Sequence, residues 1–408
     1  MLIQRAYRFE LGPNGAMRRA FSRFAGAKRF VWNAALKEPK YLGYRKNCAL
    51  LKEWKVANPW LPEIHSQVLQ QGLKDLDKAF KNFFAGRAEH PKPKKKFKCQ
   101  DSFRFPQGFK IEEGNSRLYL PKIGWVRYRN SRALRGVAKN ITICREGTKW
   151  FISIQTEYEV EEPVHASVSK VGVDLGIVRF ATLSDGSFVE PLNAMKKRAI
   201  RLRRYQRTMS RKVKFSKNWK KAKARVAKLH EDVANSRKDF LHKLTTDQTK
   251  THGLICIEDL KVGNMSRSAA GTADKPGKQV KQKSGLNRSI LDQGWSEYRR
   301  QMEYKMGWAG GQVVAVPAMN TSRQCPSCGH ISKYNRKTQA NFVCVECGFA
   351  ANADYVAAIN VLNRGLIWIE GKDMADASAR SESAAQIACR GNLEVRGPMK
   401  QEPTERAA

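Results

Sequence analysis

Residues 321–365 read TSRQCPSCGHISKYNRKTQANFVCVECGFAANADYVAAINVLNRG. This stretch contains two Cys-x2-Cys knuckles with fifteen residues between them, and a glycine follows each knuckle. The cysteines are Cys325, Cys328, Cys344 and Cys347. Four thiolates at this spacing enclose one tetrahedral Zn²⁺ in a closed site, which is structural and not catalytic. We therefore predict a zinc ribbon. His330 is an alternative ligand, but four cysteines already fill the shell, and a redox dithiol or unpaired thiols are the other interpretation.

Three acidic residues accompany the predicted ribbon. Asp174 follows the short β-like run Lys-Val-Gly-Val, and Glu258 ends the apolar run Leu-Ile-Cys-Ile. Asp354 comes seven residues after the second knuckle and opens a helical pattern. A carboxylate on a buried strand is costly unless it is paired or bound to a metal. These positions are therefore candidates for a second metal site.

Each of these residues has another interpretation when it is taken alone. Asp174 could cap a turn, and Asp354 could be the N-cap of its helix. Asp259 competes with Glu258, because side chains alternate along a strand and only one of the two can face the site. Together, a strand Asp, a strand Glu and a late helical Asp form the set that two divalent ions need for phosphodiester hydrolysis. Oxygen ligands favour Mg²⁺ or Mn²⁺ over Zn²⁺. The set indicates a metal-dependent nuclease.

The net charge points to a polyanionic partner. The 408 residues include 76 Lys and Arg against 37 Asp and Glu, a formal charge of +39. Such a charge repels itself unless a polyanion such as nucleic acid neutralises it. An anionic membrane is the rival partner, but no apolar run reaches the roughly 18 residues that span a bilayer. The N-terminus has no apolar signal-peptide core, so we expect a reducing cytoplasm, where zinc is favoured over disulfides.

Hydrophobic periodicity predicts several elements. Residues 2–12 alternate as a strand, and residues 16–37 follow a helical pattern. The clearest helix is 66–84, whose polar face carries glutamines and lysines. Residues 117–158 have β patterns. The N-terminal strand can pair with these residues in one sheet, with the helices as an insertion between them. A new domain begins near Val171, whereas the composition of 264–288 is typical of a flexible loop.

Residues 196–228 form a basic helical stretch. It holds sixteen Lys or Arg and no acidic residue, with Tyr205, Phe215 and Trp219 interleaved. Such a block can simply be a solvated face. Because no acidic partner lies within the stretch, we favour binding to a phosphate backbone instead.

The chain resembles the TnpB family, transposon-encoded RNA-guided nucleases related to type V CRISPR effectors. The matching motifs span nearly the whole chain in order and include FVWNAAL (30–36), LQQGLKDLDKAFKNFF (69–84), VGVDLGIVRFATLSDG (171–186), NSRKDFLHKLTT (235–246), IEDLKVGNM (257–265), GWSEYRRQMEYK (294–305), TSRQCPSCG (321–329), CVECG (344–348) and NADYVAAINVLNRG (352–365). One departure is Val356, where many relatives have Asn.

The resemblance implies a multidomain α+β and α/β fold. A β-barrel wedge domain (1–14 and 114–166) would carry a helical recognition insertion (15–113). An RNase-H-like RuvC domain (167–320 and 351–370) would carry the zinc ribbon (321–350) as a target-nucleic-acid-binding insert, and 371–408 would be a flexible tail.

The resemblance also implies an activity. The protein would bind a noncoding guide RNA from the transposon end, one copy of the chain per RNA, recognise a short motif beside the target and cut double-stranded DNA. Asp174, Glu258 and Asp354 would be its catalytic carboxylates, and the four cysteines its zinc ligands. The expected nucleic-acid contacts are Gln70, Lys74, Gln107, Arg203, Arg204, Arg211, Lys212, Lys220 and Lys221. A guided repressor without cleavage and a transposase that acts without RNA are the alternatives.

Overall fold

The computed structural model describes residues 1–371 except 97 and 273, so the predicted tail at 372–408 lies outside the described residues. The chain divides into two compact units, Met1–Glu162 and Pro163–Ala408, close to the boundary expected at residues 166 and 167. In the described part of the chain, no helix combines the length and apolar character needed to cross a bilayer.

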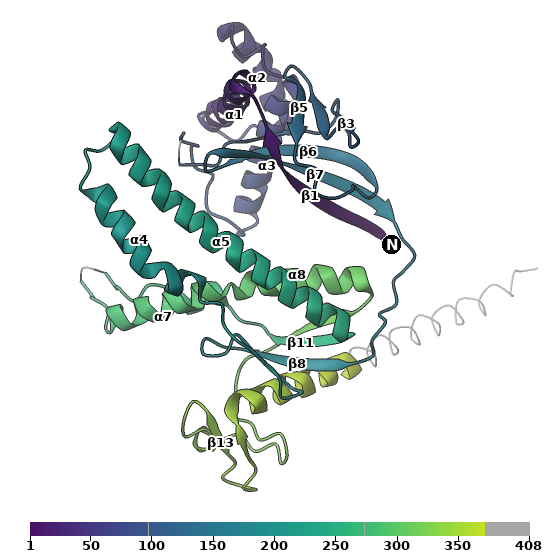
Figure 1. The fold of residues 1–408 in the computed structure, drawn as a ribbon, viewed down its shortest axis with the longest axis vertical. Helices are drawn as coiled ribbons and strands as arrows, with labels where there is room; N and C mark the ends of the chain where they lie inside the picture. The colour runs from purple at the N-terminus through teal and green to yellow at the C-terminus, as the bar shows by residue number, and fades with distance from the viewer. Residues whose placement is uncertain (97, 273, 372–408) are drawn as a thin grey trace, which may run out of the picture. The chain divides into compact units, whose positions relative to one another are not determined.

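The first unit is a seven-stranded antiparallel sheet with three helices (Figure 1). The strand order is β2-β6-β7-β1-β5-β4-β3. The strands are β1 (Leu2–Gly12), β2 (Ser102–Phe105), β3 (Lys110–Glu112), β4 (Arg117–Leu120), β5 (Gly124–Tyr128), β6 (Val137–Glu146) and β7 (Lys149–Glu159). The helices are α1 (Gly15–Leu36), α2 (Gly43–Ala57) and α3 (Ser66–Phe84). The N-terminal strand therefore pairs with β5 and β7, as the sequence patterns indicate.

Helix α3 has the bounds expected from the sequence, because its apolar residues recur at helical spacing. Leu69, Leu73 and Leu76 are fully buried against the sheet side of the unit. One residue of its expected polar face, Gln71, is also buried. The 3.6-residue period brings position 71 beside the apolar stripe, so only part of the polar face meets solvent.

Two expectations are wrong in detail. Strands β2 and β3 fall inside the range expected for a helical insertion, 15–113, but they belong to the sheet. Phe103 and Phe105 carry β2 into the core on alternate positions, a pattern too short to stand out in sequence. The expected loop at 264–288 is also partly helical, because Ile290 and its neighbours pack the helix at 280–293 into the second unit.

The second unit is built on a five-stranded sheet of order β10-β9-β8-β11-β12. Strands β8, β11 and β12 are parallel, whereas β9 and β10 are antiparallel to their neighbours. The strands are β8 (Lys170–Leu175), β9 (Ala181–Leu183), β10 (Phe188–Val189), β11 (Leu254–Glu258) and β12 (Gln312–Val316), and β13 (Asn341–Val343) pairs with β14 (Ala350–Asn352) separately. The helices are α4 (Ala194–Ser210), α5 (Lys217–Thr251), α6 (Val262–Met265), α7 (Val280–Gln293), α8 (Trp295–Ala309), the 3-10 turn η1 (Lys333–Asn335) and a last helix at residues 353–371.

The two faces of this sheet are covered differently. Helices α5 and α8 pack on the face that holds Val171, Val173 and Ile255 (Figure 1). The last helix packs on the opposite face, where Val361 contacts the cluster that includes Cys256. Since successive strand residues point to opposite faces, one strand can supply apolar side chains to one side and polar ones to the other.

Two glycines bring the last helix close to the sheet. A Cβ atom at Gly172 of β8 would collide with the backbone of Ala358 and Leu362. A Cβ atom at Gly365 of the helix would collide with the Cys256 side chain of β11. The missing side chains therefore set the distance at which this helix, which begins just before Asp354, lies across the two central strands.

We expect Gly172→Ala to destabilise the second unit by about 1–3 kcal/mol, because the added methyl group meets backbone atoms that cannot yield cheaply. Thermal and urea unfolding of the full chain would measure the loss. Gly285→Ala in α7 is the matched control, because nothing lies within 4 Å of a Cβ atom there. Equal unfolding midpoints for the two variants would contradict the close packing of the helix on β8.

Candidate functional site

Strand register brings Asp174 and Glu258 to one place. β8 and β11 are parallel, and Val173 lies beside Ile257, so the two carboxylates occupy the same level at the carboxyl ends of their strands. Asp174 and Glu258 each lie two residues after Gly172 and Cys256, so they point to the same face of the sheet as those residues, toward the last helix. Asp259 has the opposite parity, and its carboxylate pairs with Lys261 at 2.7 Å and with Arg299 of α8 at 2.6 Å. The competition between Glu258 and Asp259 is therefore resolved in favour of Glu258.

Asp354 lies in the first turn of the last helix but does not cap it. The capping side chain is Asn352, whose Oδ1 accepts hydrogen bonds from the backbone nitrogens of Asp354 at 3.0 Å and Tyr355 at 3.4 Å. The carboxylate of Asp354 is thus free for another role. Arg336 donates to its Oδ1 at 3.3 Å.

The three carboxylates act on one another electrostatically. Burial and the negative charges of Glu258 and Asp354 together raise the pKa of Asp174 to about 8, while the charge of Arg336 opposes the shift. These effects on Asp174 indicate that the other two carboxylates lie near it. A bound divalent cation would remove the repulsion, and the all-oxygen donor set is the type that Mg²⁺ and Mn²⁺ prefer.

Glu258 is also held by a buried hydrogen bond. Thr321 donates its hydroxyl to Glu258 Oε1 at 2.7 Å, and both residues are buried. Burial raises the pKa of Glu258, whereas this hydrogen bond and the charge of Arg364 lower it. Thr321 therefore favours the ionised carboxylate and fixes one of its oxygens.

The residues around Thr321 tie the root of the ribbon to the last helix. Asn360, which is buried, donates to the carbonyls of Thr321 and Gln324, both at 2.7 Å. Arg364, one turn further, donates to the carbonyls of residues 317 and 319 and to Gln324. Sequence reasoning missed Thr321, Asn360 and Arg336, because each bonds to a partner that is distant in the sequence and that no motif spacing indicates. Their only signal in the sequence is their position: Thr321 precedes the first knuckle, Arg336 lies between the two knuckles, and Asn360 lies in the last helix.

The four predicted zinc ligands converge. One ligand atom from each of them lies within 4.8 Å of all the others. The Sγ–Sγ distance is 3.6 Å both for Cys325 with Cys347 and for Cys328 with Cys344. Tetrahedral Zn²⁺ with bonds of about 2.3 Å separates its sulfurs by about 3.8 Å. His330 contributes its backbone carbonyl to the fold of the knuckle, as an acceptor from Cys325.

The thiol chemistry also fits a bound cation. Backbone hydrogen bonds from Cys347 and Glu346 lower the pKa of Cys344 to about 6, although desolvation opposes them. At Cys328 a backbone hydrogen bond from His330 lowers the pKa, but desolvation and the neighbouring cysteines outweigh it and raise the value to about 12. Without a cation the cluster keeps a proton, because four thiolates this close repel one another. Zn²⁺ would allow all four to ionise.

The predicted nucleic-acid contacts are mostly exposed. Those of the second unit lie on α4, on α5 and in the turn between them, and all six are exposed: Arg203, Arg204, Arg211, Lys212, Lys220 and Lys221. In the first unit, Lys74 and Gln107 are exposed and Gln70 is half-buried. Lys74 also lies 5.5 Å from the centre of the Tyr44 ring.

Comparison with known proteins gives matches to families and to whole chains. The family OrfB_IS605, described as "Probable transposase", matches residues 153–269, and "Cas12f1-like, TNB domain" matches residues 295–361. A "Helix-turn-helix domain" family, HTH_OrfB_IS605, matches residues 1–44.

Two relatives are similar over most of their length. "Putative RNA-guided DNA endonuclease InsQ" of Escherichia coli (strain K12) is 50% identical over 98% of this chain and 97% of its own. "Putative RNA-guided DNA endonuclease" of Streptomyces pristinaespiralis is 33% identical over 89% and 90%. The solved "mini-RNA-guided endonuclease CRISPR-Cas_phi3" covers 89% of this chain and 92% of its own, with 11% identity and a TM-score of 0.44.

We expect Cys344→Ser to lose about one equivalent of zinc and to destabilise the ribbon, because binding of a structural zinc contributes directly to folding. Elemental analysis and thermal unfolding of the full chain would measure both effects. Cys99→Ser, outside the cluster, is the control. Unchanged zinc content in Cys344→Ser would count against the site.

Proposed function

This chain belongs to the TnpB family of transposon-encoded proteins, and we propose that it is an RNA-guided DNA endonuclease that cuts by metal-dependent phosphodiester hydrolysis. The observation that supports this most is the cluster of Asp174, Glu258 and Asp354 on one face of the five-stranded sheet. A merely structural protein would gain nothing from a buried Asp174 whose pKa is raised further by two neighbouring carboxylates.

The three carboxylates are the ligands of the catalytic cation, Mg²⁺ or Mn²⁺. When bound, divalent cations supply water activation and stabilise the leaving oxygen of the phosphodiester. Asp174 and Glu258 hold fixed positions because their strands are paired, and Asp354 is fixed by the capped first turn of the last helix. Thr321 orients Glu258. Arg336 compensates part of the negative charge beside Asp354.

The two units take the roles that the family implies. The second unit is an RNase-H-like RuvC domain, supported by its central parallel strands, with the zinc ribbon as a target-nucleic-acid-binding insert. The first unit is the wedge domain, a β-barrel with a helical recognition insertion. The ordered helical part of that insertion ends with α3, since β2 and β3 belong to the sheet.

The partners are a noncoding guide RNA from the transposon end and double-stranded target DNA. The charge of +39 supports both, and the guide pairs with one target strand while the protein reads a short adjacent motif. Gln70 and Gln107 contact this motif, and Lys74 contacts nucleic acid. One copy of the chain binds each RNA, in the cytoplasm or nucleoid of a bacterium or archaeon.

A guided DNA-binding repressor without cleavage is the second candidate. Such a protein would not need the acidic cluster, which is complete in this chain. A transposase that joins DNA ends without RNA is the third, and it would have no use for an RNA that co-purifies with the chain.

We expect the purified complex with its RNA to linearise a matched plasmid in the presence of Mg²⁺. Asp174→Ala should abolish cutting, because it removes a ligand of the cation, while RNA binding stays unchanged. Gel analysis of the plasmid and a filter-binding assay would separate the two effects. Wild-type protein that binds the plasmid but never cuts it would overturn the enzyme assignment in favour of the repressor.

We expect Thr321→Val to raise the Mg²⁺ concentration for half-maximal cutting by about 10- to 100-fold, because the buried Glu258 loses the hydrogen bond that orients it. Thr321→Ser should restore most of the affinity for Mg²⁺. Thr251→Val, on the exposed surface of α5, is the control. If Thr321→Val cuts with the Mg²⁺ dependence of the wild type, Thr321 has no part in positioning Glu258.

A further inference from the structure

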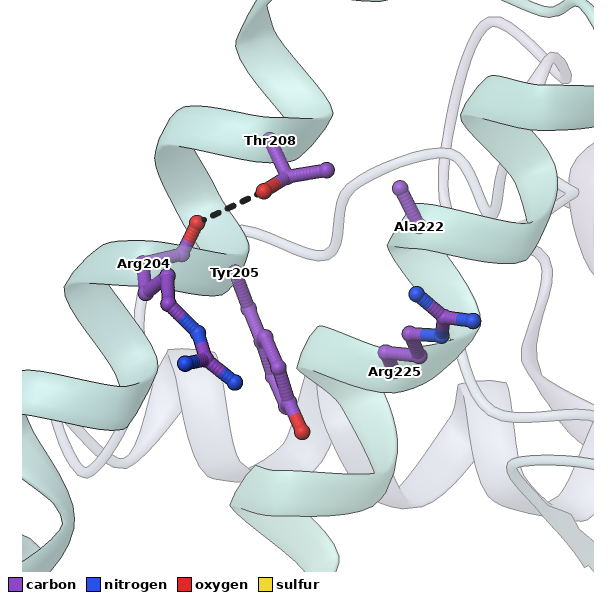
Figure 2. Close-up of a pocket in the computed structure, with 5 residues that line it drawn as sticks. All are labelled: Arg204, Tyr205, Thr208, Ala222 and Arg225. Atoms are coloured by element: carbon purple, nitrogen blue, oxygen red, sulfur yellow. Dashed lines mark hydrogen bonds between the residues drawn. The ribbon is translucent and has the colours of Figure 1, made fainter.

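A small pocket lies between α4 and α5, away from the acidic cluster in sequence and made by different elements. Figure 2 shows Arg204, Tyr205 and Thr208 on α4 facing Ala222 and Arg225 on α5. The pocket encloses about 140 Å³. Sites for drug-sized ligands enclose about 300–1,000 Å³, so this one is suited to a single small group.

The positive charge at this pocket has no acidic partner among the described residues. Neither Arg204 nor Arg225 forms an ion pair in that part of the chain, and no Asp or Glu lies between residues 194 and 230. The first ion pairs along α5 begin at Lys228, which contacts Glu231 and Asp232. The pocket is therefore a place where an anion would relieve repulsion.

Tyr205 stands at the centre of these charges. Arg201 donates to its hydroxyl at 2.9 Å, and the guanidinium of Arg204 lies 5.9 Å from the ring centre. The hydrogen bond from Arg201 lowers the pKa of Tyr205, and the charges of Arg201, Arg204 and Arg225 lower it further, against desolvation. Arg225 acts on Tyr205 from the other helix, so positive charge reaches this ring from both α4 and α5.

The only hydroxyl contact drawn in the pocket is internal. Thr208 donates to the backbone carbonyl of Arg204 at 3.0 Å. Because this hydroxyl is already bonded, the Arg204 and Arg225 guanidinium groups are the charged donors that line the pocket. Ala222, which is buried, supplies a small side chain at the floor and keeps the space open.

We propose that this pocket seats one backbone phosphate of a bound nucleic-acid strand, held from two sides by Arg204 and Arg225. The guanidinium fork matches two phosphate oxygens, which a lysine ammonium does not. The Tyr205 ring lies against the sugar or base next to that phosphate. The proposal rests on the proposed function, because it assumes a bound strand, and the guide RNA and the target DNA offer the same phosphodiester chemistry.

Lysine substitutions test the fork without changing the charge. Arg225→Lys and Arg204→Lys should each weaken binding by about tenfold, since bidentate hydrogen bonds are lost. The slope of log affinity against log salt should stay the same, because the charge remains. Arg288→Lys is the control, since Arg288 is exposed on α7, outside the basic stretch, and does not line the pocket.

Two titrations with the full-length chain identify the strand. One uses the RNA that co-purifies with the chain, resynthesised and labelled, and the other uses a matched DNA duplex added to the RNA-loaded chain. A loss in the first assigns the phosphate to the guide, and a loss only in the second assigns it to the target DNA. If both pocket variants bind both probes as tightly as Arg288→Lys does, the pocket is a solvated surface and the proposal is wrong.

The failure of the proposed function would look different. In that case the wild-type chain would bind no RNA or cut no matched plasmid, before any substitution is made. Thermal unfolding of the lysine variants confirms that they are folded, and exposed Arg→Lys changes are expected to leave the midpoint unchanged.

Discussion

Mutual repulsion among three carboxylates is the constraint on which the second unit depends. Asp174 and Glu258 lie on one face of the sheet, and Asp354 lies on the helix that covers this face. Burial, together with the charges of Glu258 and Asp354, raises the pKa of Asp174 to about 8. Such a cluster persists only if the surrounding structure holds it in place and a cation compensates it. Paired strands fix two members, and a helix capped by Asn352 fixes the third.

The zinc ribbon is physically joined to this cluster. Thr321, four residues before the first cysteine, bonds to Glu258, and Asn360 of the last helix holds the backbone on both sides of that turn. Arg336 reaches from inside the ribbon to Asp354. A folded ribbon thus places two side chains at the acidic cluster. A structural zinc that is not itself part of the acidic cluster can therefore influence the cluster through these bonds.

Positively charged side chains occur in two different settings in the second unit. Among the described residues, the arginines and lysines from 196 to 225 of the α4–α5 hairpin form no ion pair, whereas the acidic cluster is compensated by Arg336 and Arg364. The hairpin attracts phosphates, and the cluster attracts cations that bind phosphates. Both features belong to the second unit, which therefore carries opposite charges at two separate places.

Local patterns in the sequence determined the elements and the candidate ligands. The leucine spacing of 66–84, the two knuckles and the apolar runs before Asp174 and Glu258 each reflect interactions between near neighbours, which are visible in a string of letters. Tertiary structure alone decided that Glu258 and not Asp259 faces the last helix, that Phe103 and Phe105 join the sheet, and that Arg225 lines the same pocket as Arg204. These outcomes depend on strand parity, on burial and on contacts between residues distant in sequence, where the position of one chain segment is fixed only by another.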